Sequence, residues 1–559
     1  MGVGFYPVGR AMTNAHARTL EATILETYSK VMKKYFVTQV INITVIMIAR
    51  TTFPTIRILS LLASYAAASS SLNGSISHGS MGLRRGDRIQ VRRTFAGVMD
   101  VPRAKPSSPR PSASVMLRRD DEILLCHRVS TVPAFPDYWA FPGGGVSRID
   151  RDPMFALSRE MAEEVGLTPQ MTHIDANLRK EILADKNVFA AAVDDGRITL
   201  TSAGFDLISE RTTPPLAPLR FHNQFFTVKC QLDPILEDGN RVEFDAYRWA
   251  TPAQFLEEWL NHEIKIPPPI IMLLRDLVGK DLEEAIQILA NDPPSNNTRI
   301  EFAPGVECVP IPTNTLPPAT HTNCYVLGVP GGPRVIIDPA AKSAEGLKIL
   351  EEKIHEINRS GSEILATIFT HRHADHIGDL KAISSMYQAP IWATAETHET
   401  IPACDSDSVL KEGDSFQLGD VSWSIIETPG HCPGQLCLVS EAGIVSADNV
   451  VQVGTILVPS GEGNMTQYIA GLHRLRDLDA NLLFPGHGPM VANPNKLLTH
   501  YIEHRQKRHE AIYTAWHSGL REIEELSHAA YADTPDAHPL LKIDQTMSHL
   551  DALRNEGRI

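Results

Sequence analysis

Histidine and aspartate side chains cluster in the sequence THRHADHIG at residues 370–378, directly after the apolar run 364–369. The ligand candidates in this cluster are His371, His373, Asp375 and His376. A strand that ends at Thr370 would present three imidazoles and a carboxylate on one tight turn. This set of donors suits zinc, which binds histidine nitrogens and carboxylate oxygens. The cluster therefore predicts a metal site.

Three further ligand candidates follow downstream. They are His431, Asp448 and His487. Each comes after a short apolar or β-branched run and lies among Gly, Pro or Ser residues, which is typical of a strand end that passes into a loop. We therefore expect all these side chains to lie along one rim of a sheet.

In these motifs the chain resembles the metallo-β-lactamase superfamily, from about Glu301 to His500. The resemblance implies an αββα sandwich with two zinc ions at its edge. The ligands that it implies for the first ion are His371, His373 and His431. Those that it implies for the second ion are Asp375, His376 and His487, with Asp448 as the bridging carboxylate. Asp338, which follows an apolar run, is expected to be a structural partner and not a ligand.

Such a pair of ions predicts hydrolysis. Bound zinc lowers the pKa of water from about 15.7 towards 7 and polarises a carbonyl or phosphoryl oxygen. We expect Asp375 to act as a catalytic residue that orients the water. Penicillin-hydrolysing members of the superfamily commonly carry Cys where this chain has Asp448. The resemblance therefore favours the thioesterase, glyoxalase II and nuclease branches.

The C-terminal part predicts three helices, at 501–516, 520–531 and 541–556, and a small winged-helix-like cap. With the segment 314–327, this arrangement resembles the β-lactamase-like-2 subgroup, which includes single-strand-specific endoribonucleases and fungal acyl-carrier-protein thioesterases. The substrate therefore stays open between a thioester and a phosphodiester in single-stranded RNA. Basic residues at 504–509 could contact phosphates, although a solvated helix face is the stronger interpretation.

A second set of chemistry-bearing residues lies upstream, in the sequence REMAEEVGL at 159–167. On a helix its three neighbouring carboxylates share one face and suit a hard cation such as Mg²⁺. They belong to Glu160, Glu163 and Glu164. The spacing from Gly145 resembles the signature of the Nudix hydrolases. This resemblance implies that the three carboxylates bind Mg²⁺ or Mn²⁺, that Glu163 and Glu164 are catalytic, and that Arg159 orients a glutamate.

One position departs from the Nudix signature. The sixth residue after Gly145 is Arg151 where the signature has Glu, and it is flanked by Asp150 and Asp152. This position is mainly structural in the family, so the departure weakens the expectation of efficient turnover without removing the metal ligands. A Nudix fold that binds its ligand without hydrolysing it is therefore an alternative.

The rest of the upstream region is similar to the coenzyme A diphosphatase branch of Nudix enzymes, on strands expected at 220–226 and 243–252. The resemblance implies an α/β/α sandwich and a small-molecule diphosphate substrate. Glu243 is a candidate general base, and an exposed strand residue is an equally good interpretation. An acidic-apolar helix is expected at 273–289.

A length of 559 residues predicts several domains. We expect a disordered or targeting extension at 1–106, a Nudix domain at 107–290, a linker at 291–300, a metallo-β-lactamase domain at 301–500 and a helical winged-helix-like domain at 501–559. The linker includes NDPPSNN, a turn-rich sequence that few contacts should cross. No oligomeric state is predicted.

Composition narrows the classes of function. A net charge of −14 argues against non-specific binding to bulk nucleic acid. Seven cysteines without paired spacing fit reduced thiols in an intracellular compartment, either the cytoplasm or the mitochondrion. The apolar stretch 35–49 is interrupted and too short for a spanning helix, so no stable membrane span is expected. Ser- and Arg-rich residues at 69–93 resemble a transit sequence; a disordered extension, or a true start at Met81, are the alternatives.

These expectations combine into a bifunctional metal-dependent hydrolase. Its zinc domain would cleave a thioester or phosphodiester, and its Nudix domain would cleave a nucleoside-diphosphate-linked substrate. The alternative is a single-activity zinc hydrolase or endoribonuclease with a non-catalytic, nucleotide-sensing Nudix domain.

Overall fold

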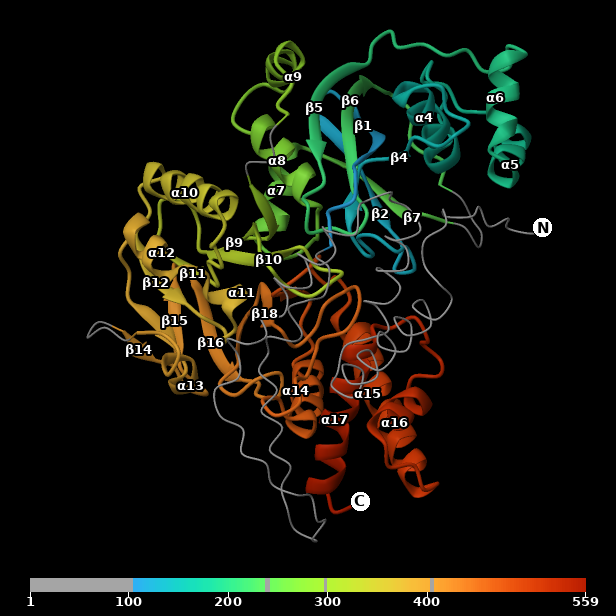
Figure 1. The fold of residues 1–559 in the computed structure, drawn as a ribbon. Coiled ribbons are helices and arrows are strands. Elements are labelled where there is room, and N and C mark those ends of the chain that lie inside the picture. Colours follow the sequence, from blue (N-terminus) through green and yellow to red (C-terminus); the bar gives the residue numbers. More distant parts are fainter. Residues whose placement is uncertain (1–103, 237–241, 296–298, 403–406) are drawn as a thin grey trace, which may run out of the picture. The chain divides into compact units, whose positions relative to one another are not determined.

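Three β-sheets organise the chain in a computed structural model that describes residues 104–236, 242–295, 299–402 and 407–559 (Figure 1). All of these residues belong to the compact unit Arg93–Ile559. The expectations for the N-terminal extension, its apolar stretch and its transit-like segment lie outside the described residues. No helix among those described is both long and apolar enough to cross a membrane.

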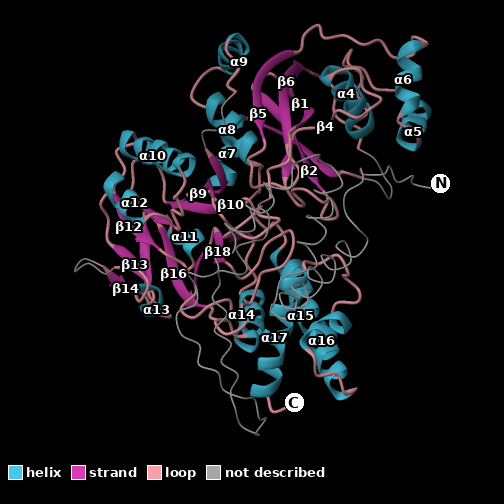
Figure 2. Ribbon diagram, viewed as in Figure 1, coloured by secondary structure: helices cyan, strands magenta, loops and turns pink. Residues whose placement is uncertain are grey.

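The first sheet has seven strands and belongs to the upstream region (Figure 2). They are β1 (Arg110–Arg119), β2 (Glu122–Arg128), β3 (Trp139–Ala140), β4 (Gly143–Gly145), β5 (Asp206–Thr212), β6 (Phe221–Lys229) and β7 (Phe244–Ala250). Strand β1 runs parallel to β6 and antiparallel to β2 and β4. Its apolar side chains are buried on both faces, as expected for a central strand covered on two sides.

Helices cover both faces of this sheet. They are α4 (Pro153–Glu160), which continues as a π-helical segment (Met161–Val165), α5 (Ala176–Ala184), α6 (Asn187–Asp194), α7 (Pro252–Leu260), α8 (Pro268–Leu277) and α9 (Leu282–Asn291). Leu157, Met161 and Val165 pack on one face, whereas Phe255 and Ile270 pack on the other. The expected α/β/α sandwich is therefore present.

The single helix expected at 273–289 is wrong. The chain forms α8 and α9 instead, with a break between them at Gly279, whose φ is +86°. Helix α8 ends where Val278 takes an extended conformation, with a ψ of 145°, and Gly279 then turns the chain with a positive φ that glycine adopts at little cost. The apolar periodicity continues across the break, which explains why the pattern predicts one helix.

The other two sheets pack face to face. One contains β8 (Ile300–Ala303), β9 (Val306–Pro312), β10 (His321–Leu327), β11 (Arg334–Ile337), β12 (Ile364–Ile368), β13 (Ile391–Ala393) and β14 (Ser408–Val409). The other contains β15 (Ser415–Leu418), β16 (Val421–Glu427), β17 (Leu436–Ser440), β18 (Gly443–Ala447) and β19 (Leu483–Pro485). Tyr325 and Ile337 from the first meet Trp423, Leu438 and Phe484 from the second in one buried cluster.

Helices complete the sandwich on its outer faces. They are α10 (Ala344–Arg359), α12 (Leu380–Met386) and α14 (Met465–Asp477), whereas the four-residue helices α11 (Ala374–Ile377) and α13 (Ala395–His398) follow β12 and β13 at the rim. Leu350 and Ile354 of α10 pack against Val326 and Ile336. Tyr468 of α14 packs on the outer face of the five-stranded sheet. This layering is the expected αββα sandwich.

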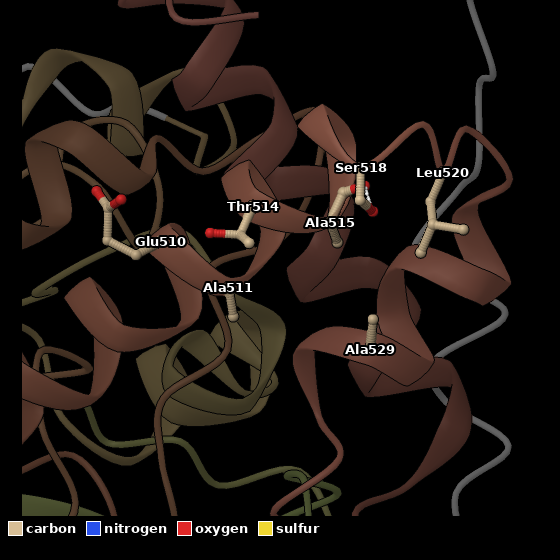
Figure 3. Close-up of a pocket in the computed structure, with 7 residues that line it drawn as sticks. All are labelled: Glu510, Ala511, Thr514, Ala515, Ser518, Leu520 and Ala529. Atoms are coloured by element: carbon tan, nitrogen blue, oxygen red, sulfur yellow. Dashed lines mark hydrogen bonds between the residues drawn. The ribbon is translucent and has the colours of Figure 1, made fainter.

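Three helices form the C-terminal region: α15 (Pro494–His517), α16 (Ile523–Ala530) and α17 (Pro539–Asn555). Helix α15 is capped by Asn493 and runs through the boundary expected at residue 500. The described residues after β19 form no further named strand, so the winged-helix likeness stays a prediction. A surface hollow of about 430 Å³ between α15 and α16 is lined mainly by small side chains (Figure 3). Its one ionisable lining residue is Glu510, so this hollow offers no set of catalytic groups.

The carboxyl ends of four strands meet at one rim of the sandwich. Strands β11 and β12 are parallel neighbours in one sheet, and β18 and β19 are parallel neighbours in the other. Asn323 joins the two sheets there: its backbone N–H donates to the Gly486 carbonyl at 2.8 Å and its amide Nδ2 to the Pro485 carbonyl at 2.9 Å. The histidine motifs follow these strand ends.

Candidate functional site

The turn after β12 is anchored by Asp338, the residue after β11. Its Oδ1 accepts a hydrogen bond from the Thr370 backbone N–H at 2.8 Å, and its Oδ2 accepts one from the Thr370 hydroxyl at 2.6 Å. The same Oδ2 accepts from His376 Nδ1 at 2.8 Å. Both oxygens of this buried carboxylate are therefore engaged in holding the turn.

Five histidines converge at the rim, and each has an acceptor for one ring nitrogen. The acceptors are Thr370 Oγ1 for His371 at 3.0 Å, Glu462 Oε2 for His373 at 3.4 Å, Asp338 Oδ2 for His376 at 2.8 Å, the Leu457 carbonyl for His431 at 2.6 Å and the His321 carbonyl for His487 at 2.9 Å. An acceptor fixes the ring proton on the nitrogen that faces it. In each neutral ring the second nitrogen therefore carries a lone pair.

These second nitrogens approach one another closely. His373 Nδ1 lies 2.9 Å from His431 Nε2, and His376 Nε2 lies 3.2 Å from His487 Nε2. Two lone pairs at such distances repel unless a proton or a metal cation lies between them. Two nitrogens bound to one tetrahedral zinc ion at about 2.0–2.1 Å are about 3.3 Å apart. The spacing therefore fits a shared metal ion.

Asp448 lies between the two histidine groups. Its Oδ2 is 3.6 Å from His431 Nε2 and 3.5 Å from His487 Nε2, and its Oδ1 is 3.5 Å from His376 Nε2. Asp448 Oδ1 and His371 Nε2 are two of the buried polar atoms that have no hydrogen-bond partner within the described residues. Buried polar atoms normally have partners, so both atoms fit the role of metal ligands.

The electrostatics divide the ligand candidates into two groups. Against the effect of burial, Asp448 and Asp338 raise the pKa of His376 well above its usual value, and Asp448 raises the pKa of His487. Burial, together with His376 and His373, lowers the pKa of His371 well below its usual value. Burial and His373 lower the pKa of His431 to about 4. Burial raises the pKa of Asp448, but charges on His487 and His376 outweigh it and hold the pKa well below its usual value. Neutral imidazoles and ionised carboxylates are the forms that bind metals.

Two groups of predicted ligands are complete in space. His371, His373 and His431 offer ligand atoms within 4.8 Å of one another, and so do Asp375, His376 and His487. Asp338, His371 and His376 also form such a group. The oxygens of Asp338 already accept three hydrogen bonds, however, so the role expected for it as a structural partner agrees with this geometry.

Glycine is required beside the ligand candidates. A Cβ atom on Gly486 would lie 2.5 Å from Asp448 Oδ1 and 2.8 Å from His376 Cε1. A Cβ atom on Gly378, whose φ is +73°, would lie 2.6 Å from the Ala341 carbonyl oxygen. Contacts this short force neighbouring atoms to move, so both glycines let the backbone pass close to the site.

Sequence reasoning missed Glu462, which is 89 residues away from His373 in the chain. Glu462 accepts from His373 Nε2 and also from Arg372 Nε at 2.8 Å. Burial raises the pKa of Glu462, but hydrogen bonds and charges from His373 and Arg372 lower it to about 2. No motif or spacing marks this residue, because its partner is set by the fold of the loop after β18.

A cavity of about 760 Å³ opens beside the ligand candidates. His373, Asp375, His431, Asp448 and His487 line it. The wall also contains many apolar side chains: Leu216, Leu316, Pro317, Pro318, Val451, Val453, Ile456 and Leu457. Lys105 and Lys342 are the only cationic side chains among its described lining residues other than histidines.

The basic run at 504–509 does not form a solvated basic face. Arg505, Arg508 and His509 are buried. Arg505 Nη1 donates to Gln545 Oε1 at 2.7 Å, and Arg508 donates to the Ala530 carbonyl. Both the solvated-face interpretation and the phosphate-binding alternative are wrong for these three residues, because their polar atoms hold the helical region together.

Arg159 is at the centre of the upstream site. Its side chain is fully buried, and its guanidinium donates from Nε and Nη2 to the two oxygens of Asp150, each at 2.9 Å. Nη1 donates to Glu160 Oε1 at 2.9 Å and to both oxygens of Glu163 at 3.2 Å. The expectation that Arg159 orients a glutamate therefore matches its contacts.

Asp150 supplies the carboxylate that Arg151 lacks. The Asp150 side chain is fully buried and pairs with Arg159 through both oxygens. The Arg151 side chain is 52 % exposed and pairs with Asp194 at the surface. The buried arginine thus pairs with the carboxylate that directly precedes Arg151. A bidentate pair of this kind is geometrically specific.

The three helical carboxylates lie on one side of the helix but are held apart. Glu164 Oε2 accepts from the Gly143 N–H at 2.8 Å, and burial with the charges of Glu160 and Glu243 raises the pKa of Glu164 well above its usual value. Burial raises the pKa of Glu160 too. Unlike the histidines, these carboxylates form no group of three ligand atoms within 4.8 Å in the described structure. Glu243 accepts from Arg128 Nη1 at 2.6 Å.

Arg179 of α5 is a second residue that sequence reasoning missed. Its Nη2 donates to the backbone carbonyls of Glu163 at 2.8 Å and Glu164 at 3.2 Å, and its Nη1 to the Ile235 carbonyl at 2.6 Å. The π-helical segment leaves these carbonyls at a helix end, where acceptors lack intrahelical partners. Arg179 thereby fixes the end of the helix that carries the carboxylates.

Comparison with known proteins agrees with this arrangement. A family model described as the NUDIX domain matches residues 108–268, and one described as the Metallo-beta-lactamase superfamily matches residues 317–487. The chain therefore joins a NUDIX domain to a metallo-beta-lactamase superfamily domain. Both families are hydrolases that generally bind divalent metals, and this chain is a multidomain, metal-binding hydrolase.

Named relatives match parts of the chain. A Beta-lactamase-like protein 2 homolog of Caenorhabditis elegans is 26 % identical over 248 residues, covering 42 % of this chain and 79 % of the relative. An Atrochrysone carboxyl ACP thioesterase of Aspergillus fumigatus is 25 % identical over 216 residues, covering 38 % of this chain and 65 % of the relative.

Solved structures are similar to the two domains separately. A NUDIX hydrolase from Alicyclobacillus acidocaldarius has a TM-score of 0.30 and 23 % identity, covering 34 % of this chain and 99 % of its own. A metallo-beta-lactamase family protein from Thermus thermophilus has a TM-score of 0.38 and 20 % identity, covering 46 % of this chain and 95 % of its own.

The histidine geometry predicts about two metal ions per chain by elemental analysis. His376→Ala or His487→Ala removes a nitrogen from the group of Asp375, His376 and His487 and leaves the group of His371, His373 and His431 intact, so each variant should retain about one ion. His528→Ala, which changes an exposed histidine on α16, is the control and should retain two. Full occupancy in both site variants would contradict the assignment of His376 and His487 as ligands.

The Asp150 geometry predicts different effects for two adjacent substitutions. Asp150→Asn leaves a buried arginine with less negative charge around it, which should cost about 3 kcal/mol of unfolding free energy and most of any Mg²⁺-dependent turnover. Arg151→Ala changes an exposed ion pair and should stay within about 0.5 kcal/mol of the parent. Urea unfolding of the full chain measures both. Equal effects of the two substitutions would show that Asp150 does not replace the missing glutamate.

Proposed function

We propose that the metallo-beta-lactamase domain is a zinc-dependent thioesterase and that the NUDIX domain is a Mg²⁺-dependent hydrolase of a nucleoside-diphosphate-linked small molecule. The observation that carries the proposal of a zinc site is the convergence of five histidine side chains. One ring nitrogen of each histidine has a hydrogen-bond acceptor, and the other nitrogen is available as a ligand. A donor set rich in imidazole nitrogens favours zinc over Mg²⁺.

The residues of the zinc domain have separate roles in this proposal. His371, His373 and His431 would hold one ion, and Asp375, His376 and His487 the other, with Asp448 contacting both. Bound zinc supplies an activated water at neutral pH and a Lewis acid for the carbonyl oxygen. Asp375 lines the cavity, its side chain is 25 % exposed, and its Oδ2 lies 3.6 Å from His487 Nε2. In this proposal its carboxylate would accept a proton from water and orient that water.

The cavity wall favours a thioester over RNA. Affinity for a nucleic acid backbone comes from several Lys and Arg contacts to phosphates. The described cavity lining contains two lysines and no arginine, and the arginines of α15 are buried in internal contacts. Apolar side chains dominate the wall, as in pockets for small apolar groups. The name of the Aspergillus fumigatus relative, a thioesterase, supports the same substrate class.

The NUDIX domain supports hydrolysis through its carboxylates. Glu160, Glu163 and Glu164 would bind Mg²⁺ or Mn²⁺, which neutralises the charge on substrate phosphates. Burial raises the pKa values of Glu160 and Glu164, and charge repulsion between the groups adds to this effect. A bound cation relieves both costs. The likeness to coenzyme A diphosphatases supports a small-molecule diphosphate as substrate.

A nucleotide-sensing NUDIX domain without turnover is the second candidate. Arg159 Nη1 contacts both Glu160 and Glu163, and the three carboxylates do not gather as tightly as the histidines do. If this arrangement persists when a nucleotide binds, the carboxylates would bind ligand and metal without activating water. Measurement of Mg²⁺-dependent product release distinguishes the sensing role from the catalytic role.

An acyl-coenzyme A contains both bonds that the proposal concerns. With Zn²⁺, the full chain should release a free thiol from it, and this release should be lost in His371→Ala. A fluorescent single-stranded RNA oligonucleotide should stay intact under the same conditions. Rapid RNA cleavage without thiol release would overturn the thioesterase proposal in favour of an endoribonuclease.

The two activities should be separable by substitution. Replacing Glu163 and Glu164 together with alanine should abolish Mg²⁺-dependent release of 3′,5′-ADP from coenzyme A while leaving zinc-dependent thiol release unchanged. The matched control replaces Glu257, an exposed acid on α7, with alanine. If the parent chain binds nucleotide diphosphates with Mg²⁺ but releases no product, the sensing role replaces the catalytic one.

A further inference from the structure

The C-terminal helices contact the loop that orients two of the candidate zinc ligands. This loop, here called the pocket segment, comprises residues 451–463 between β18 and α14. Its Leu457 carbonyl accepts from His431 Nδ1 at 2.6 Å, and its Glu462 accepts from His373 Nε2 at 3.4 Å. Both histidines belong to the same group of ligand atoms. The position of the pocket segment therefore fixes the direction of two imidazoles.

Gln545 of α17 bonds to the segment directly beside Leu457. Its Nε2 donates to the Val458 carbonyl at 2.8 Å, and its Oε1 accepts from the Val458 N–H at 3.4 Å. The same Oε1 accepts from Arg505 Nη1 at 2.7 Å, and Arg505 also donates to the Ile456 carbonyl. The backbone on both sides of Leu457 is thus held by two buried side chains of the helical region.

Asp544 holds the same loop nearer to Glu462. Its Oδ1 accepts from the Ser460 hydroxyl at 2.6 Å and its Oδ2 from the Ser460 N–H at 3.1 Å. At the start of the segment, the Tyr501 hydroxyl of α15 accepts from the Val451 N–H at 3.1 Å and donates to the Val451 carbonyl at 2.8 Å. The segment has no regular secondary structure of its own, so these side chains replace the strand and helix contacts that would otherwise fix it.

We propose that Gln545 and Asp544 are positioning residues for the zinc site, acting through the pocket segment on His431 and His373. This inference rests on the proposed zinc function. Groups that orient metal-binding histidines typically contribute about 10- to 100-fold to metal affinity. The helical region would then be part of the metal centre's support, beyond any role in binding substrate.

Cobalt binding to the full-length chain tests this inference, because the visible absorption of bound Co²⁺ reports ligand geometry independently of turnover. Gln545→Met removes both bonds to Val458 at similar side-chain length. Asp544→Ala releases Ser460 at a half-buried position, and Asp544→Asn keeps an oxygen acceptor there. Thr546→Val is the matched control, since Thr546 is fully buried on the same helix and its hydroxyl bonds only to the Lys542 carbonyl among the hydrogen bonds described.

The parent chain and Thr546→Val should bind two Co²⁺ ions with the same spectrum. Gln545→Met and Asp544→Ala should bind one of the two about tenfold more weakly, with altered absorption, and Asp544→Asn should recover part of the loss. Unchanged affinity and spectrum in Asp544→Ala would overturn the inference, even if Gln545→Met fails to fold. A parent chain that binds no Co²⁺ would instead overturn the proposed zinc site itself.

Discussion

The convergence of five imidazoles and a buried carboxylate at one rim is the constraint on which the second domain depends. Nitrogen lone pairs separated by 2.9 to 3.2 Å repel each other, and burial of Asp448 costs solvation energy. Such an arrangement persists only if the surrounding structure determines the position of every ring. Each ring accordingly has its own acceptor: Thr370, the neighbouring residue, for His371, and for the other four rings a residue 26 to 166 positions away in the chain. The folded scaffold thus offsets the unfavourable free energy of bringing the donors together before any cation binds.

The αββα sandwich makes this arrangement possible because it holds two sheets in fixed register. Strands β11 and β12 deliver Asp338 and the histidine turn from one sheet, whereas β18 and β19 deliver Asp448 and His487 from the other. A continuous apolar core between the sheets, including Trp423 and Phe484, resists sliding of one sheet over the other. Close backbone passage at Gly486 then brings Asp448 and His376 together.

The parts of both sites that could be predicted from sequence are those encoded locally. Ligand candidates follow apolar runs, and the helical carboxylates have fixed spacing, so their types and their elements are readable. Contacts set by tertiary structure are not. Glu462 meets His373 across 89 residues, and Leu457 contributes a backbone carbonyl that carries no sequence signal. The chain leaves α8 at the extended Val278 and turns at Gly279, although the apolar pattern continues across this break.

The departure at Arg151 is a second example of a contact that a sequence pattern does not predict. A signature read position by position finds an arginine where an acid is expected, but the physical requirement is a carboxylate that can reach the buried Arg159. Asp150 meets it from the neighbouring position. The two sites also differ in how the charges of their ligand candidates are balanced. In the NUDIX domain an internal guanidinium compensates the carboxylates, so a cation that enters must compete with Arg159 for Glu160 and Glu163. At the histidine rim no internal cation of that kind lies among the ligand groups of the described residues, so their lone pairs and carboxylates are left to an external ion. Weak, exchangeable binding of a hydrated hard ion suits the first arrangement, and tight binding of a borderline metal suits the second.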